Sequence, residues 1–145
     1  MAARVHWSFW VVGILALLWH AGSVMNLGMQ LNPEMMEKMP ESHKAIAKAR
    51  PWWATGAFAI SAIAGALGAL AFLNRHRICG PLFFLSFIGS ILAVLQAVAT
   101  GGAMQVFSGF ELILVVVGPV AVGLFLVVFA HRARKNGWLR GSSVE

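Results

Sequence analysis

Residues 51–74 read PWWATGAFAISAIAGALGALAFLN and contain no acidic or basic side chain. About 20 apolar residues of α-helix cross the roughly 30 Å hydrocarbon core of a bilayer, because the helix rises about 1.5 Å per residue. Three further stretches are similarly apolar, at residues 6–29, 81–102 and 110–131; none contains Lys or Arg, and their one acidic residue, Glu111, stands at an end. The sequence therefore predicts an all-α membrane protein, a bundle of four transmembrane helices arranged as two helical hairpins.

The composition agrees with a membrane location. Of the 145 residues, 59% are hydrophobic and 11% are charged, whereas soluble domains carry about 25% charged residues. One domain, covering residues 1–145, is expected at this length. The single cysteine, Cys79, excludes an intrachain disulfide and a cysteine metal cluster.

The basic residues stand in short clusters beside the apolar stretches, which indicates anchoring in a lipid bilayer rather than nucleic-acid binding. Cytoplasmic loops are enriched in Lys and Arg. Seven basic residues fall on the side of the two termini and four in the loop at 30–50: Arg4, Arg75, Arg77, Arg132, Arg134, Lys135 and Arg140 against Lys38, Lys44, Lys48 and Arg50. We therefore expect both termini, with the tail 132–145, in the cytoplasm.

The outer loop, residues 30–50, is predicted to contain helix. The order Asn-Pro-Glu at 32–34 favours a helix start, and Pro40 interrupts the chain. Residues 41–50 predict a short amphipathic helix at the membrane surface, with three apolar side chains turned inward: Ala45, Ile46 and Ala49.

Methionine is frequent in this loop, and a thioether is a soft ligand that selects Cu(I). The copper candidates are Met35, Met36, Met39 and His43. The alternative is that these methionines are flexible apolar fillers where helices meet the interface.

Five polar side chains belong to the predicted membrane helices and concentrate toward the outer half of the bilayer: His20, Thr55, Ser61, Gln96 and Glu111. Such groups are costly in lipid unless they face protein or water. They form either hydrogen-bonding glue between helices or a small polar cavity open to the outside, or His20 meets headgroup water. No nucleophile–base arrangement or metal-ligand motif accompanies them, so we expect no enzyme, no catalytic residue and no cofactor.

Helix packing is also indicated. Small residues recur every four positions and let helix backbones approach closely: Ala57, Ser61, Gly65 and Ala69 in the second stretch, then Gly89, Ala93 and Ala97 in the third. The pair Gly118-Pro119 predicts a kink in the fourth stretch, either a static bend or a gating hinge.

Four segments carry a resemblance: GILALLWHAG, PWWATGAFAISAIAGALGALAFL, CGPLFFLSFIGSILAVLQ and FAHRARKNGWLR. With them the chain resembles, nearly end to end, a family of small four-helix proteins of the bacterial inner membrane, sometimes labelled sugar transporters. Family members commonly have Asn where this chain has His20, which implies hydrogen bonding at that position rather than base catalysis or metal ligation.

Two functions are expected from these features. The first is a non-catalytic accessory or partner-binding subunit, because the chain is small, carries small-residue stripes and lacks a reactive constellation. The alternative is a small-solute, sugar-type transporter working as a homo-oligomer, because four helices enclose little room. Copper binding at the outer face is a third hypothesis.

The expected orientation is testable with reporter fusions. Green fluorescent protein fused after Glu145 should fluoresce, and alkaline phosphatase fused there should be inactive, because the basic residues hold this side in the cytoplasm. Phosphatase inserted after Lys38 should be active. Activity of the phosphatase after Glu145 would contradict the orientation.

Overall fold

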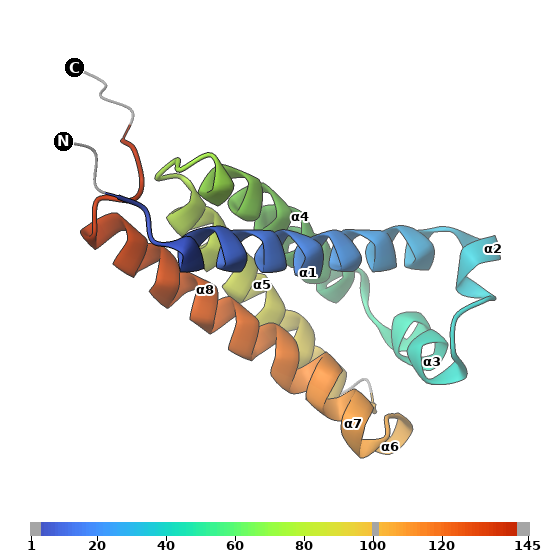
Figure 1. The fold of residues 1–145 in the computed structure, drawn as a ribbon. Helices are drawn as coiled ribbons and strands as arrows, with labels where there is room; N and C mark the ends of the chain where they lie inside the picture. Colours follow the sequence, from blue (N-terminus) through green and yellow to red (C-terminus); the bar gives the residue numbers. More distant parts are fainter. Residues whose placement is uncertain (1–3, 100–101, 142–145) are drawn as a thin grey trace.

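The computed structural model describes residues 4–99 and 102–141, and four long helices form its body (Figure 1). They are α1 (Trp7–Leu31), α4 (Trp52–Leu73), α5 (Cys79–Ala99) and α8 (Gly118–Lys135). The last continues from α7 (Gly109–Leu112) through a π-helical turn, η1 (Ile113–Val117). Short helices fill the connections: α2 (Pro33–Met36), α3 (Glu41–Ala49) and α6 (Ala103–Val106).

All four long helices are long and apolar enough to cross a membrane, the fourth counted from Gly109 to Lys135. The chain is therefore a multi-pass membrane protein, as predicted. The helix bounds follow the predicted ones closely, except that the fourth helix continues four residues beyond 131, through RARK at 132–135. The end predicted for the third stretch partly falls on residues 100–101, outside the described residues. The grouping into two hairpins and the outer placing of α3 stay predictions.

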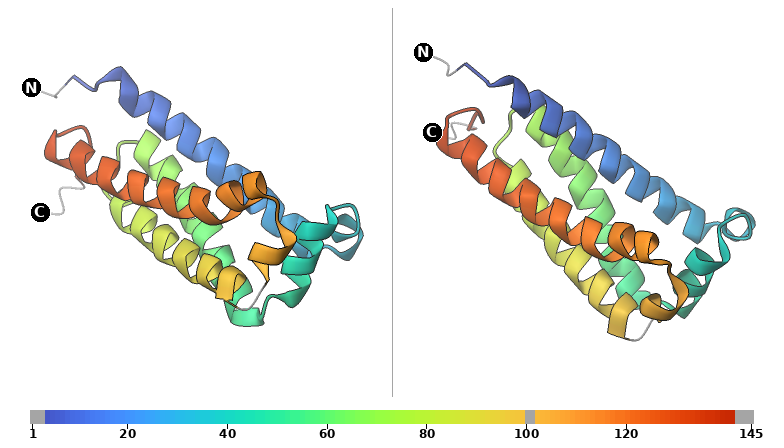
Figure 2. Two further views of the ribbon diagram at one scale, coloured as in Figure 1. Left: turned by 90° about the horizontal axis from the view of Figure 1, so that it is seen from below. Right: turned by 60° about the horizontal axis from the view of Figure 1, so that its bottom comes forward.

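The helices pack in a simple order. Helix α4 lies along both α1 and α5, and α5 lies along α8. Both termini lie at the same end of the bundle, and the other end carries α3 (Figures 1 and 2). The two ends of the bundle are consequently built differently.

The end with the termini is closed by aromatic side chains. Phe9, Phe72 and Phe83 are fully buried there, and the rings of Phe9 and Phe72 stack with centroids 4.1 Å apart. Trp138, beyond α8, packs edge-on against Phe9. The Arg75 Nε donates to the Trp138 carbonyl at 2.7 Å, which ties the α4–α5 connection to the C-terminal segment.

The contact between α4 and α5 is close because small residues face one another. A Cβ at Gly89 would lie 2.7 Å from the Ala57 carbonyl oxygen and 3.1 Å from the Ser61 Cβ. The Oγ atoms of Ser61 and Ser90 are 2.6 Å apart, and the Ser86 hydroxyl donates to the Ser61 carbonyl at 2.7 Å. The small-residue stripes thus pack inside the bundle.

The other predicted packing residues are buried as well. Gly65 receives the ring of His20, Ala69 belongs to the aromatic core cluster, and Ala93 lines a cavity described below.

The fourth long helix is irregular where Gly118-Pro119 predicts it. Pro119 has no N–H, and its ring crowds the carbonyl one turn back. The chain responds with the π turn, in which the Gly118 N–H donates to the Ile113 carbonyl, five residues back. A gating role for this turn stays a prediction.

One detail of the predicted loop helix is wrong. Ile46 is buried, but Ala45 and Ala49 are exposed. The inward face of α3 instead carries Ser42, whose hydroxyl donates to Glu111, and His43, whose ring meets that of Phe107. These contacts rotate the helix away from the orientation that apolar residues alone favour.

Substitution of Gly89 tests the close helix contact. Gly89→Ala should lower the free energy of unfolding by about 1–3 kcal/mol, because the new methyl group meets backbone that cannot move aside cheaply. Gly56→Ala is the matched control, since a Cβ there meets nothing within 4 Å. Unfolding in SDS followed by circular dichroism measures both. Equal stability of the two variants would contradict this packing.

A candidate ligand cavity beneath helix α3

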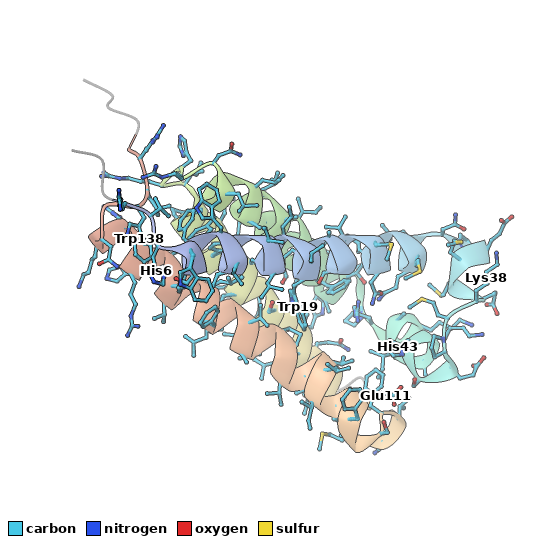
Figure 3. All side chains as sticks on the ribbon, viewed as in Figure 1. His6, Trp19, Lys38, His43, Glu111 and Trp138 are labelled. Atoms are coloured by element: carbon cyan, nitrogen blue, oxygen red, sulfur yellow. The ribbon has the colours of Figure 1, made fainter. Side chains whose placement is uncertain are left out.

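A cavity of about 90 Å³ extends from the middle of the bundle to the end of α3. Five polar residues line it: His20, Ser23, Arg50, Ser61 and Ser90. The rest of the wall is apolar and is formed by Trp19, Ile46, Phe58, Ala93, Val94, Ala97, Val115 and Pro119. Figure 3 shows Trp19 between α1 and α8. The space admits a few non-hydrogen atoms of a ligand or several waters.

His20 projects from α1 and is only 4% exposed. Its ring lies against Gly65 of α4, where a Cβ would be 2.1 Å from both Cε1 and Nδ1. Among the described residues neither ring nitrogen has a hydrogen-bond partner. A buried polar group without a hydrogen bond costs about 1–3 kcal/mol of stability. A molecule in the cavity that bonded these ring nitrogens would remove part of that cost.

Arg50 lies at the other end of the cavity, between the end of α3 and Pro51. Its Nη1 donates to the Gln30 Oε1 at 2.9 Å, and its guanidinium carbon lies 5.0 Å from the centroid of the Phe58 ring. Its buried Nε has no hydrogen-bond partner in the described parts of the chain. Burial lowers the pKa of Arg50, but a guanidinium group stays protonated in proteins.

Two of the glutamates that precede Arg50, Glu37 and Glu41, form ion pairs with lysines. The Lys44 Nζ lies 3.4 Å from a Glu37 carboxylate oxygen and 2.7 Å from one of Glu41, and Lys48 lies 3.6 Å from Glu37. Lys44 lowers the pKa of Glu37, and Glu41 raises the pKa of Lys44. Across residues 4–99 and 102–141 no carboxylate forms a salt bridge with Arg50.

The structure brings together only part of the predicted polar cluster. His20 and Ser61 both line the cavity, but the Ser61 hydroxyl is bonded to Ser90 rather than to His20. Gln96 is buried on α5 and is not part of the cavity wall. The predicted hydrogen bonds from His20 to other helices are therefore not formed.

Thr55 and Glu111 lie outside the cavity because each has a local partner. The Thr55 hydroxyl donates to the Pro51 carbonyl at 3.4 Å. Glu111 forms a capping box with Ser108 and accepts a hydrogen bond from Ser42. In Figure 3, Glu111 lies near His43, at the wide end of the bundle.

Sequence reasoning missed Arg50 as a site residue because it treats the residue as one of several loop charges. A signal was nevertheless present. Arg50 stands four residues after Ile46 and directly before Pro51, so a helical turn brings its side chain onto the buried face of α3. The long side chain then reaches the apolar wall beside Phe58.

The copper candidates are distributed over two short helices and a turn. Met35 and Met36 belong to α2 and Met39 is buried just before α3, while His43 packs edge-on against Phe107. Within the described ranges no group of three His, Cys, Asp or Glu side chains is placed to hold a metal. Copper binding by thioethers stays a prediction.

A double-mutant cycle tests the contact of His20 with Gly65. Gly65→Ala should destabilise the protein because the methyl group displaces the imidazole, whereas the same change in a His20→Ala background should cost little. Coupling energies of about 0.5–3 kcal/mol are typical of touching residues. Unfolding in SDS measures the cycle, with Gly22→Ala, whose Cβ meets nothing within 4 Å, as the control. Additive effects would contradict the contact.

Comparisons with known proteins leave the family open. No protein-family model, no curated protein and no solved structure matches the chain. The resemblance to the small four-helix bacterial proteins therefore stays a prediction, and function has to be argued from the cavity itself.

Proposed function

We propose that the chain is a non-catalytic membrane protein that binds a small solute in the cavity beneath α3, as the binding step of a small-solute carrier. The observation that carries this proposal is the pair His20 and Arg50. Both reach the same cavity from different helices, and both present buried nitrogen atoms that the described protein leaves without hydrogen-bond partners.

The chemistry of a membrane interior supports this function. Ionisable groups within membrane helices, such as His20, are expensive to bury and commonly mark substrate or ion pathways. Small-molecule sites are concave, mostly apolar and furnished with a few convergent polar groups. The cavity has this character, with Trp19 and Phe58 in its wall and Arg50 and His20 as its polar groups.

The predicted accessory role gains less support. Its argument from sequence rests on small-residue stripes that bring helices together. Those stripes already make contacts inside the bundle, through Ala57, Gly65 and Gly89. A protein partner would have to bind some other face.

Two further features favour a carrier. The aromatic cluster of Phe9, Phe72 and Phe83 closes the end with the termini, so the cavity lies nearer the opposite end. The wall includes Val115, in the π turn, and Pro119, just after it, and such turns frequently occur at functional sites. A change in this turn would alter the cavity directly. A complete transport route would need a second copy of the chain, because one bundle encloses little space.

Ligand-dependent stability tests the proposal. The purified protein is heated in detergent with a panel of glucose, glycerol, propionate, propionamide and propylammonium. A binder at 100-fold its Kd adds about 2.7 kcal/mol, which raises the unfolding midpoint by about 5 °C or more. At least one panel member should produce such a rise.

The site is checked by filling it. Ala93→Phe should abolish the rise, because Ala93 lines the cavity, whereas Ala121→Phe on the exposed side of α8 should preserve it. A panel without any stabilising member would contradict the proposed function. So would an unchanged response in Ala93→Phe.

A further inference from the structure

We infer that the solute is a small organic anion, with its carboxylate held by Arg50 and its short hydrocarbon part against the aromatic wall, on the side of His20. This inference rests on the proposed solute site and names its chemical class. The charge, the hydrogen-bonding groups and the apolar wall of the cavity all favour such an anion.

The charge of the cavity is positive. Arg50 is the one charged side chain among the described residues of the wall, and no described carboxylate pairs with it. Removing a charge from water is costly unless an opposite charge accompanies it. Guanidinium groups bind carboxylates with short, directional hydrogen bonds. The Nε of Arg50, which has no partner in the described chain, supplies one such donor.

The hydrogen-bonding groups also select an anion. The Arg50 guanidinium is a donor without acceptor capacity, and a neutral imidazole carries one N–H donor and one acceptor, so His20 can bond a polar atom elsewhere on the solute. The remaining hydroxyls are engaged, because Ser61 pairs with Ser90 and Ser23 donates to the Trp19 carbonyl at 3.1 Å. A sugar needs several acceptors as well as donors, and the wall described here offers only one imidazole nitrogen and the oxygens of already bonded serines, with no carboxylate or side-chain amide. An ammonium ligand would be repelled by Arg50.

The apolar wall argues for a hydrocarbon part on the anion. Trp19, Phe58 and Pro119 surround a space of about 90 Å³. The guanidinium group of Arg50 lies over the Phe58 ring, which places the charge beside this wall. Burying each CH₂ group contributes about 0.8 kcal/mol, so a carboxylate of two to four carbons gains affinity that chloride cannot.

Isothermal titration of the whole protein in phosphatidylcholine nanodiscs tests the inference. Propionate is compared with propionamide, which has the same shape but no charge, with chloride, which has charge but no hydrocarbon, and with glucose. Propionate should bind at least about tenfold more tightly than any of the three, a difference of about 1.4 kcal/mol.

Two variants test whether Arg50 supplies the positive charge that binds propionate. Arg50→Gln should weaken propionate binding about tenfold or more, in keeping with loss of a charge-assisted hydrogen bond. Lys48→Gln removes a positive charge from the same helix, but its side chain is 61% exposed and outside the cavity, so binding should change less than about twofold. The comparison of propionate with propionamide uses the unchanged protein and holds even if Arg50→Gln does not fold.

Four results would overturn the inference, and they separate it from the proposed function. If glucose or propionamide bound as tightly as propionate, the cavity would still be a solute site, but the solute would not need a negative charge. If chloride bound as tightly as propionate, the solute would not need a hydrocarbon part. Absence of binding by every ligand would contradict both the inference and the proposed function. If phosphatidylglycerol discs stabilised the protein in an Arg50-dependent way and propionate did not bind, the anion that pairs with Arg50 would be a lipid headgroup.

Discussion

The close approach of α4 and α5 at Gly89 is the contact on which the rest of the structure depends. Because Gly89 has no side chain, the two backbones approach until Ser61 and Ser90 share a hydrogen bond. This contact fixes the face of α4 that carries Gly65, and Gly65 in turn makes room for the imidazole of His20. One absent Cβ therefore determines, through two neighbouring contacts, where a polar side chain can sit inside an apolar bundle.

The two ends of the bundle have opposite chemistry. Phenylalanine rings pack together at the end with the termini. The other end carries α3, and Ile46 and Arg50 contribute to the cavity wall there (Figure 1). Polar groups inside a membrane bundle are costly when they lack hydrogen bonds, and among the described residues the Arg50 Nε and both His20 ring nitrogens have no partner. A solute that bonds them would lower this cost.

The membrane spans could be predicted because uncharged stretches of this length have one stable form in lipid. Burial of His20 and the small-residue contacts followed from the same reasoning. The partners of individual polar groups could not be predicted. Thr55 and Glu111 found backbone or capping partners within a few residues, and the face of α3 was set by Ser42 and His43 rather than by its alanines. Arg50 was missed because a loop charge becomes a site residue only when the chain folds it inward.

His20 and Arg50 line the same cavity, and the proposed function requires that one solute contact both. Nitrogen-15 NMR of the imidazole side chains, during titration of propionate into protein in phosphatidylcholine nanodiscs, tests this contact. The chain has five histidines, and His131 is exposed on α8, far from the cavity wall. We expect the His20 resonances to shift while those of His131 stay in place. Unmoved His20 resonances at saturating propionate would contradict this contact.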